Sequence, residues 1–310
     1  MTENIDYESL AVLAAVVREG SFDGAARSMN VTQSAVSQRI RQLESKVGTM
    51  LIIRGRPCVP TETGQALCQH YDEVVLLQHE LKSRLAAEGQ RSAQAARIRI
   101  AVNSDSLATW FPSVVRRAAE ELNILFEISH DDQDHTEQAI RSGEALAVVT
   151  ANYTPIHGCK RISLGAMEYL AVASPDFVSR HLPDGPTLAA LAAAPCIFFD
   201  RKDTLPEQWL ENCFDQVERP PAHLVPSYEG YLSCLVNGTG WGMMPMETTE
   251  RLIRKGRLVE LIEGKRIRIS LHWQSAAQTS EILRLLSELV QDEARKLLIP
   301  DSYTVIQETA

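Results

Sequence analysis

The sequence predicts an α/β protein built from a small helical head, one long helix and a larger two-lobed domain of alternating strands and helices. Two short helical segments joined by a tight turn lie between residues 21 and 47. Residues 65–88 contain neither glycine nor proline, which favours one uninterrupted helix. From residue 98 onward, apolar runs of strand length alternate with helical segments, a pattern typical of a parallel sheet with helices on both faces.

The two short helices are delimited by residues that favour helix ends. Ser21 and Thr32 can each accept a hydrogen bond from a free backbone N–H one turn later, so each is expected to cap a helix. Asn30 lies between them and tolerates the left-handed backbone of a helix end, and Gly48 ends the second helix. The second helix carries an apolar stripe at helical period, formed by Val36, Ile40, Leu43 and Val47.

The opposite face of the second helix is rich in hydrogen-bonding side chains and poor in acidic ones. Its members are Thr32, Gln33, Ser34, Ser37, Gln38 and Arg41. Glutamine can pair with adenine, arginine with guanine and serine with either, and a helix-turn-helix presents such side chains to the major groove of double-stranded DNA. The alternative interpretation is an ordinary amphipathic helix whose polar face is solvated.

The segment after the second helix is predicted to form a two-stranded wing. Residues 50–54 form an apolar strand, residues 57–60 lead through a turn into a second strand, and Arg54 and Arg56 lie at the tip. These arginines are predicted to reach phosphate or a narrow minor groove, unless they are plain surface charges. The chain has a net charge of −9, but residues 32–56 hold five cationic residues and one acidic residue, so the head is locally basic.

The long helix is expected to begin near Thr63 and to end near Gly89. Its apolar stripe lies close to heptad spacing and comprises Leu67, Tyr71, Val74, Leu81 and Leu85. A helix of this length with an apolar seam needs a partner, so it is expected to join two heads in a dimer; the alternative is packing on its own domain. Two heads on a two-fold axis predict a pseudo-palindromic DNA site.

The remaining pattern predicts two α/β lobes joined by two crossing strands, as in solute-binding proteins. The elements expected in the first lobe are strands at 98–102, 124–129 and 145–150, helices at 107–122 and 136–141, a returning strand at 266–274 and a helix at 281–298. The predicted division is a head at 1–62, a linker helix at 63–89, a hinge at 90–96, a two-lobed domain at 97–300 (lobe I about 97–172 and 267–300, lobe II about 173–266) and a tail at 301–310.

The run SFDGAARSMNVTQSAVSQRIRQLESKVGTMLIIR, followed by PTETGQAL, closely resembles the winged helix-turn-helix of LysR-type transcriptional regulators. The length and the later α/β pattern extend this resemblance to essentially the whole chain. Within that family, the run AVNSDSLATW at 101–110 resembles the arginine- and lysine-responsive ArgP/LysG branch. The resemblance implies a winged helix-turn-helix, a linker helix and a two-lobed, periplasmic-binding-protein-like effector domain.

The same resemblance implies a function. It indicates a transcriptional regulator whose DNA binding and activation respond to a small effector, lysine or arginine, at genes of amino-acid export or metabolism. The implied partners are double-stranded DNA, a second copy of the chain in a homodimer or homotetramer, and RNA polymerase. Two alternatives stay open: a LysR-type regulator with a different effector, and a sequence-tolerant DNA-binding protein of replication or the nucleoid, which would depend strongly on salt.

Polar side chains at the ends of predicted strands indicate where an effector would bind. In open α/β sheets, ligands bind beyond the carboxyl ends of strands. The candidate residues are Asn103, Ser104, Asp105, Ser106, Thr109, Asp132, Thr150 and Glu229. The hydroxyls and backbone N–H groups would hold a carboxylate, and the acidic residues would meet the cationic groups of a basic amino acid. For residues 103–106, the alternative is helix capping alone.

Other functional classes lack the residues they need. The cluster HDDQDH at 130–135 looks like a set of metal ligands, but side chains diverge on a turn, and we predict no metal and no cofactor other than the effector. The sequence has no nucleophile elbow, phosphate loop or GxGxxG, so we expect no enzyme. It has no apolar run of about 18 residues, an acidic N-terminus, and six cysteines without a C-x-x-C pair. We therefore expect a cytoplasmic protein with reduced thiols and no membrane partner.

Overall fold

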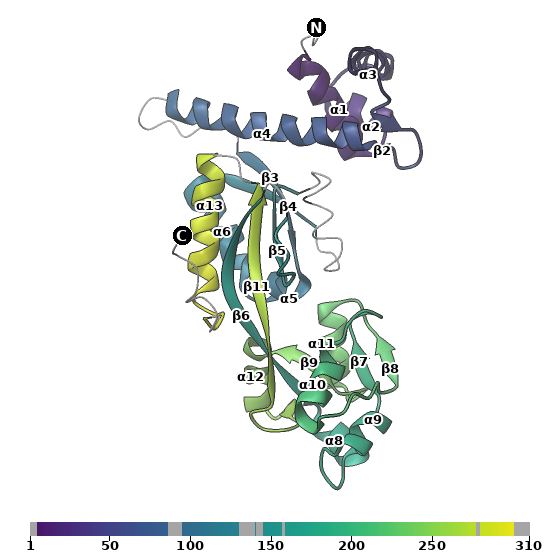
Figure 1. The fold of residues 1–310 in the computed structure, drawn as a ribbon, viewed down its shortest axis with the longest axis vertical. Coiled ribbons are helices and arrows are strands. Elements are labelled where there is room, and N and C mark those ends of the chain that lie inside the picture. Colours follow the sequence, from purple (N-terminus) through teal and green to yellow (C-terminus); the bar gives the residue numbers. More distant parts are fainter. Residues whose placement is uncertain are drawn as a thin grey trace.

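The computed structural model describes residues 5–85, 95–129, 140, 145–156, 159–276 and 280–300. Three parts follow one another along the chain (Figure 1). The N-terminal helices form a compact head, the long helix α4 extends from it, and two lobes joined by long strands lie beyond α4. The α/β architecture expected from the sequence is therefore confirmed.

The head is formed by three capped helices and a small wing. The helices are α1 (Tyr7–Glu19), α2 (Phe22–Ser28) and α3 (Gln33–Val47), and the wing pairs β1 (Ile52–Ile53) antiparallel to β2 (Val59–Pro60). The predicted caps are confirmed: Ser21 Oγ accepts from Gly24 N at 3.0 Å, and Thr32 Oγ1 accepts from Ala35 N at 3.2 Å. Asn30 has φ 54°, the left-handed conformation that its position between the helices required.

Helix α4 (Glu62–Leu85) begins directly against the wing. A Cβ atom on Gly64 would lie 2.0 Å from the carbonyl oxygen of Leu51, so only glycine permits this close approach. Leu67, Cys68 and Tyr71 then pack into the core of the head. The first half of α4 is thereby fixed to the head.

One sheet of seven strands forms the centre of the two-lobed domain among the described residues. Its strands are β3 (Ala96–Val102), β4 (Ile124–Ser129), β5 (Ala147–Thr150), β6 (Cys159–Ala173), β9 (Gly242–Pro245), β10 (Val259–Glu260) and β11 (Arg266–Ala276). Strand β3 pairs parallel with β4 and β5, as predicted. The strands that join the lobes add an antiparallel part to this sheet: β11 runs antiparallel to β5 and β6, and β9 and β10 run antiparallel to β6.

The antiparallel part has a topological cause. Strand β6 carries the chain from lobe I into lobe II, and β11 carries it back alongside, so these two strands must run in opposite directions (Figure 1). In lobe II, β7 (Cys196–Phe198) pairs parallel with β8 (Ala222–Leu224). The surrounding helices are α8 (Pro175–His181), α9 (Leu188–Ala193), α10 (Leu205–Phe214), α11 (Tyr228–Val236) and α12 (Met246–Arg254).

Two helices of lobe I differ from the sequence prediction. The single helix expected at 107–122 is divided into α5 (Ser104–Ala108) and α6 (Phe111–Leu122), because Pro112 in the first turn of α6 has no N–H for a continuing helix. The last helix, α13 (Glu281–Ala294), ends before the predicted Leu298. The chain leaves it to pair Ile299 with Ala166 through two backbone hydrogen bonds of 2.8 and 2.9 Å. The helix expected at 136–141 lies outside the described residues, apart from Ile140.

The second half of α4 is docked onto lobe I through three residues at a spacing of four. Asp72 forms an ion pair with Arg99 of β3, and Leu76, 1% exposed, belongs to the core of the two-lobed domain. Glu80 Oε1 accepts hydrogen bonds from Ser280 Oγ at 2.5 Å and from Ile282 N at 2.9 Å, at the start of α13. These residues lie on one face of the helix and fix its position against the sheet.

Truncating the apolar member of this contact should destabilise the protein. We expect Leu76→Ala to lower the free energy of unfolding by about 2–4 kcal/mol, because a leucine buried in a close-packed site leaves a cavity. Urea unfolding at fixed protein concentration measures the change. Leu125→Ala on β4 is the matched control: its leucine is 48% exposed, so the cost should stay within about 0.5 kcal/mol. Equal losses in the two variants would show that Leu76 does not stabilise the contact.

Candidate functional site

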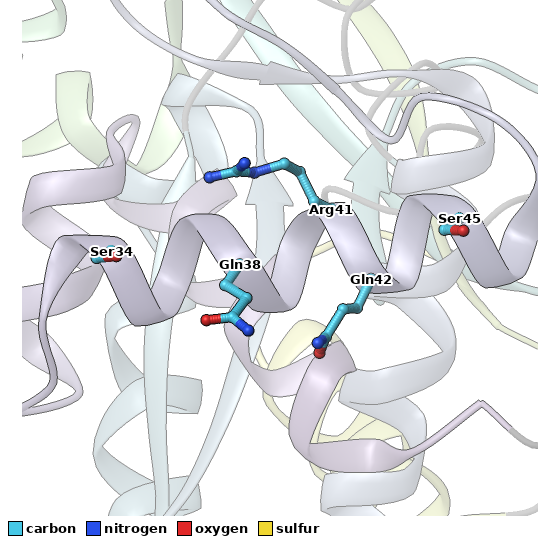
Figure 2. A pocket seen from close by; sticks show the side chains of 5 residues that line it. All are labelled: Ser34, Gln38, Arg41, Gln42 and Ser45. Atoms are coloured by element: carbon cyan, nitrogen blue, oxygen red, sulfur yellow. The ribbon is translucent and has the colours of Figure 1, made fainter.

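The exposed face of α3 presents the predicted hydrogen-bonding side chains in a row. Figure 2 shows Ser34, Gln38, Arg41, Gln42 and Ser45 along one stretch of this helix, lining a shallow hollow. Gln42 and Ser45 were not among the predicted residues. Gln42 lies four residues after Gln38, and Ser45 lies three residues after Gln42, so helical periodicity in the sequence was sufficient to identify them.

The other predicted DNA contacts are placed in different ways. Thr32 and Gln33 are exposed at the start of α3, with the Thr32 hydroxyl oxygen used as the cap, and Ser37 is half-buried. Arg54 and Arg56 are both exposed between β1 and β2, but the guanidinium of Arg54 lies over the ring of Phe22, 5.1 Å from its centroid. This stacking fixes Arg54 against α2, whereas no such contact holds Arg56 among the described residues.

The positive charge of the head is unevenly available. Arg39 pairs with Glu8 at 3.2 Å, and Lys46 pairs with Asp6 at 3.2 Å, so acidic residues at the start of α1 offset these two cations. Arg41 donates through Nε to the carbonyl of Ser37 at 3.3 Å and has no acidic partner in the part of the chain that the structure describes. Among the described residues, the cations of the α3 face and the wing without an acidic partner are therefore Arg41, Arg54 and Arg56, and Arg54 is stacked on Phe22.

A cavity of about 650 Å³ lies where the two lobes meet. Its walls come from the turns after β3 and β5, the loop after β7 with the start of α10, helix α11, and the strands β6, β9 and β11. The lining residues used below are Asn103, Ser104, Asp105, Tyr153, Tyr169, Asp200, Lys202, Asp203, Tyr228, Arg268 and His272. Carboxylates and aromatic rings together favour a cationic ligand, because both attract positive charge.

Asp105 is the acidic residue that lobe I contributes to this cavity. Its Oδ2 accepts a hydrogen bond from the hydroxyl of Tyr169 on β6 at 2.6 Å. Burial is the largest influence on this carboxyl and raises its pKa to about 6; the Tyr169 hydrogen bond opposes that shift, and nearby Asp203 adds to it. The site therefore holds a carboxylate that an added positive charge would stabilise in its ionised form.

Lobe II contributes two more carboxylates from the loop after β7. Asp203 accepts from the backbone N–H groups of Phe199 and Leu205, each at 3.0 Å. Asp200 accepts from Lys202 N at 2.7 Å and from Asp203 N at 2.9 Å. Burial raises the pKa of Asp203, although these backbone hydrogen bonds favour its charged form. The loop thus holds both acidic side chains in a defined conformation.

The cavity contains only some of the predicted effector residues. Asn103, Ser104 and Asp105 line it. Four other predicted residues are described but do not line the cavity. Ser106 is completely buried, and Glu229 is exposed on α11. Thr109 Oγ1 donates to the carbonyl of Asp105 at 2.6 Å, and Thr150 Oγ1 accepts from Asn152 N at 3.0 Å. Asp132 and the whole 130–135 cluster lie outside the described residues. Within the described residues, no group of three or more His, Cys, Asp or Glu side chains is arranged to hold a metal ion.

The sequence analysis overlooked Asp200 and Asp203, although a signal was present. The letters FFDRKD at 198–203 place acidic residues directly after the buried strand β7, just as Asn103–Asp105 follow β3. The rule that ligands bind beyond strand ends applied to both lobes. Tyr169 and Arg268 gave no comparable signal, because they lie within strands and reach the cavity only through the crossing of β6 and β11.

Comparisons with known proteins agree with this geometry. Residues 7–65 match the family described as bacterial regulatory helix-turn-helix protein, lysR family, and residues 91–295 match the LysR substrate binding domain. ArgP of Pseudomonas aeruginosa is 38% identical over 284 residues, which cover 91% of this chain and 94% of that protein.

The helices that the structure describes include none with the length and apolar character of a membrane span.

Two solved structures are similar over nearly the whole length. The crystal structure of ArgP from Mycobacterium tuberculosis has a TM-score of 0.81 and 37% identity, covering 96% of this chain and 100% of that one. Full-length LysG from Corynebacterium glutamicum, with bound effector Arg, has a TM-score of 0.72 and 34% identity with the same coverage. This chain therefore belongs to the LysR family of DNA-binding transcriptional regulators, which is a family of regulators and not of enzymes, and it is similar to ArgP and LysG over nearly its whole length.

Proposed function

We propose that this regulator binds lysine or arginine in the cavity between its lobes and thereby controls genes of amino-acid export or metabolism. The observation that carries the proposal is the gathering of Asp105, Asp200 and Asp203 around a cavity lined by tyrosines. A basic amino acid has two cationic groups and one carboxylate, so it matches an acidic site better than a neutral or dicarboxylic acid does. The bound Arg in LysG of C. glutamicum supports the same ligand class.

The proposal assigns a role to each part of the chain. The head (1–62) reads a pseudo-palindromic site through the side chains of α3 and the wing, and the effector domain (97–300) responds to the ligand. The linker helix (63–89) joins two copies; its exposed apolar side chains Leu77 and Leu81, 47% and 56% exposed, support that role. A ligand can change the arrangement of the heads only if it binds the open and the closed arrangement of the lobes with different affinities.

The first experiment is a ligand panel on the purified full-length protein. Thermal shift and calorimetry with lysine, arginine, ornithine, histidine, neutral amino acids and aromatic acids should show a response to lysine or arginine alone. A response to another acid would keep the family and overturn the effector. Absence of any response, with and without DNA, would favour the sequence-tolerant DNA-binding protein.

The DNA face can be tested by separating charge from base recognition. We expect Arg56→Ala to weaken binding to all sequences alike and to reduce the slope of log K against log salt by about one, because one phosphate contact is lost. Gln38→Ala should cost about 1–3 kcal/mol at the specific site and relax base preference there. Fluorescence anisotropy over a salt series measures both quantities. Arg180→Ala in lobe II removes the same charge far from the head and should change neither.

The raised pKa of Asp105 predicts a pH dependence of effector binding. In the free protein this carboxyl is mostly protonated below its pKa of about 6, while a cationic ligand favours the ionised form. Binding at low pH therefore releases a proton, and affinity should increase as pH rises from 5 to about 7, by up to about tenfold per unit, and then level off. Calorimetry at pH 5, 6 and 7.5 measures this change. Asp105→Asn should flatten the profile; an unchanged slope would exclude Asp105 as the source.

A further inference from the structure

The two crossing strands carry a pair of arginines that share one buried carboxylate. Arg268 of β11 lies opposite Glu168 of β6 in the strand register. Glu168 is 6% exposed; its Oε1 accepts from Arg268 Nε at 2.8 Å, and its Oε2 accepts from Arg266 Nη1 at 3.3 Å. A buried carboxylate that holds two guanidinium groups fixes the direction of both.

The two arginines differ in what remains free. Arg266 is also paired with Glu260 at 3.7 Å and does not line the cavity. Arg268 does line the cavity, and its side chain is 60% exposed. Only its Nε is engaged, so its two terminal amino groups have no partner among the residues that the structure describes. One edge of this guanidinium is anchored, and the other edge is open.

An open guanidinium edge has a preferred ligand. Its two parallel N–H groups match the two oxygens of a carboxylate, which an ammonium group cannot do with the same directionality. The other charged groups of the cavity are Asp105 on one lobe and Asp200, Lys202 and Asp203 on the other. A ligand bound to the carboxylates through its cations would need an anion-binding group elsewhere in the same cavity.

We propose that Arg268 binds the α-carboxylate of the effector and that Glu168 is the positioning residue that presents it. The inference rests on the proposed function, because it assumes an amino-acid effector. It adds that the site selects amino acids over the corresponding amines. The carboxylate is held by the strand that joins the lobes, while the cationic groups are held by the lobes themselves.

The test compares ligands that differ only in the carboxylate. Arginine and its decarboxylated analogue agmatine, and lysine and cadaverine, are titrated into the full-length protein by calorimetry. The parent protein should prefer the amino acid by about 30-fold or more, a factor within the range for a hydrogen bond to a charged group. Arg268→Gln should lose that preference, with amino-acid affinity reduced about 30-fold and amine affinity changed less than about threefold.

Matched variants make the result specific. Arg266→Gln removes the neighbouring arginine, which shares Glu168 but lies outside the cavity, and should keep the preference. Glu168→Gln should weaken the preference in part, since Arg268 keeps its charge but loses its anchor. Equal loss of both ligands in Arg268→Gln, no loss at all, or loss of the preference only in Lys202→Gln would overturn the assignment. A parent protein that binds neither arginine nor lysine would overturn the proposed function together with this inference.

Discussion

The ion pair between Asp72 and Arg99 fixes the geometry on which the rest of the molecule depends. Its two side chains are 18% and 24% exposed, and it joins the linker helix to the first strand of the effector domain. Burial raises the pKa of Asp72, while Arg99 and also Arg18 of α1 act in the opposite direction. A partly buried pair contributes little net stability, because desolvation offsets the attraction, but it specifies one orientation. Asp72 thus lies in the field of a cation from the head and is paired with one from the effector domain.

Strand β3 brings this junction close to the effector cavity. Arg99 lies within the strand, and the residues Asn103–Asp105, which line the cavity, follow directly after its end. Leu76 and Glu80 of α4 hold the same lobe at its core and at the start of α13. Lobe I and the linker helix are therefore joined at three points, and under the proposed function closure of the cavity would move lobe II relative to them.

Local features of the sequence predicted local structure well. Ser21 and Thr32 cap their helices as predicted, because a cap depends only on a few neighbouring residues. The cavity was predicted in part, from polar residues after one strand. Its remaining groups depend on contacts across the chain: Tyr169 meets Asp105 over 64 residues, and Arg268 meets Glu168 over 100. The Arg268–Glu168 pair is set by the register of β6 and β11, and the Tyr169–Asp105 pair by the approach of α5 to β6; no periodicity within one strand reveals either.

The register of these strands also locates the point of bending. Leu271 lies opposite Gly165, but His272 lies opposite Ser163, so β6 has one extra residue, Leu164, at this place. A bulge of this kind bends the strand and increases its twist. His272 adjoins the shift, and Ser270 and Arg268 lie two and four residues before His272 on β11; all three line the cavity. A ligand held by Arg268 would therefore bind next to the irregular part of the connection, where a change in the angle between the lobes needs the least disruption of strand pairing.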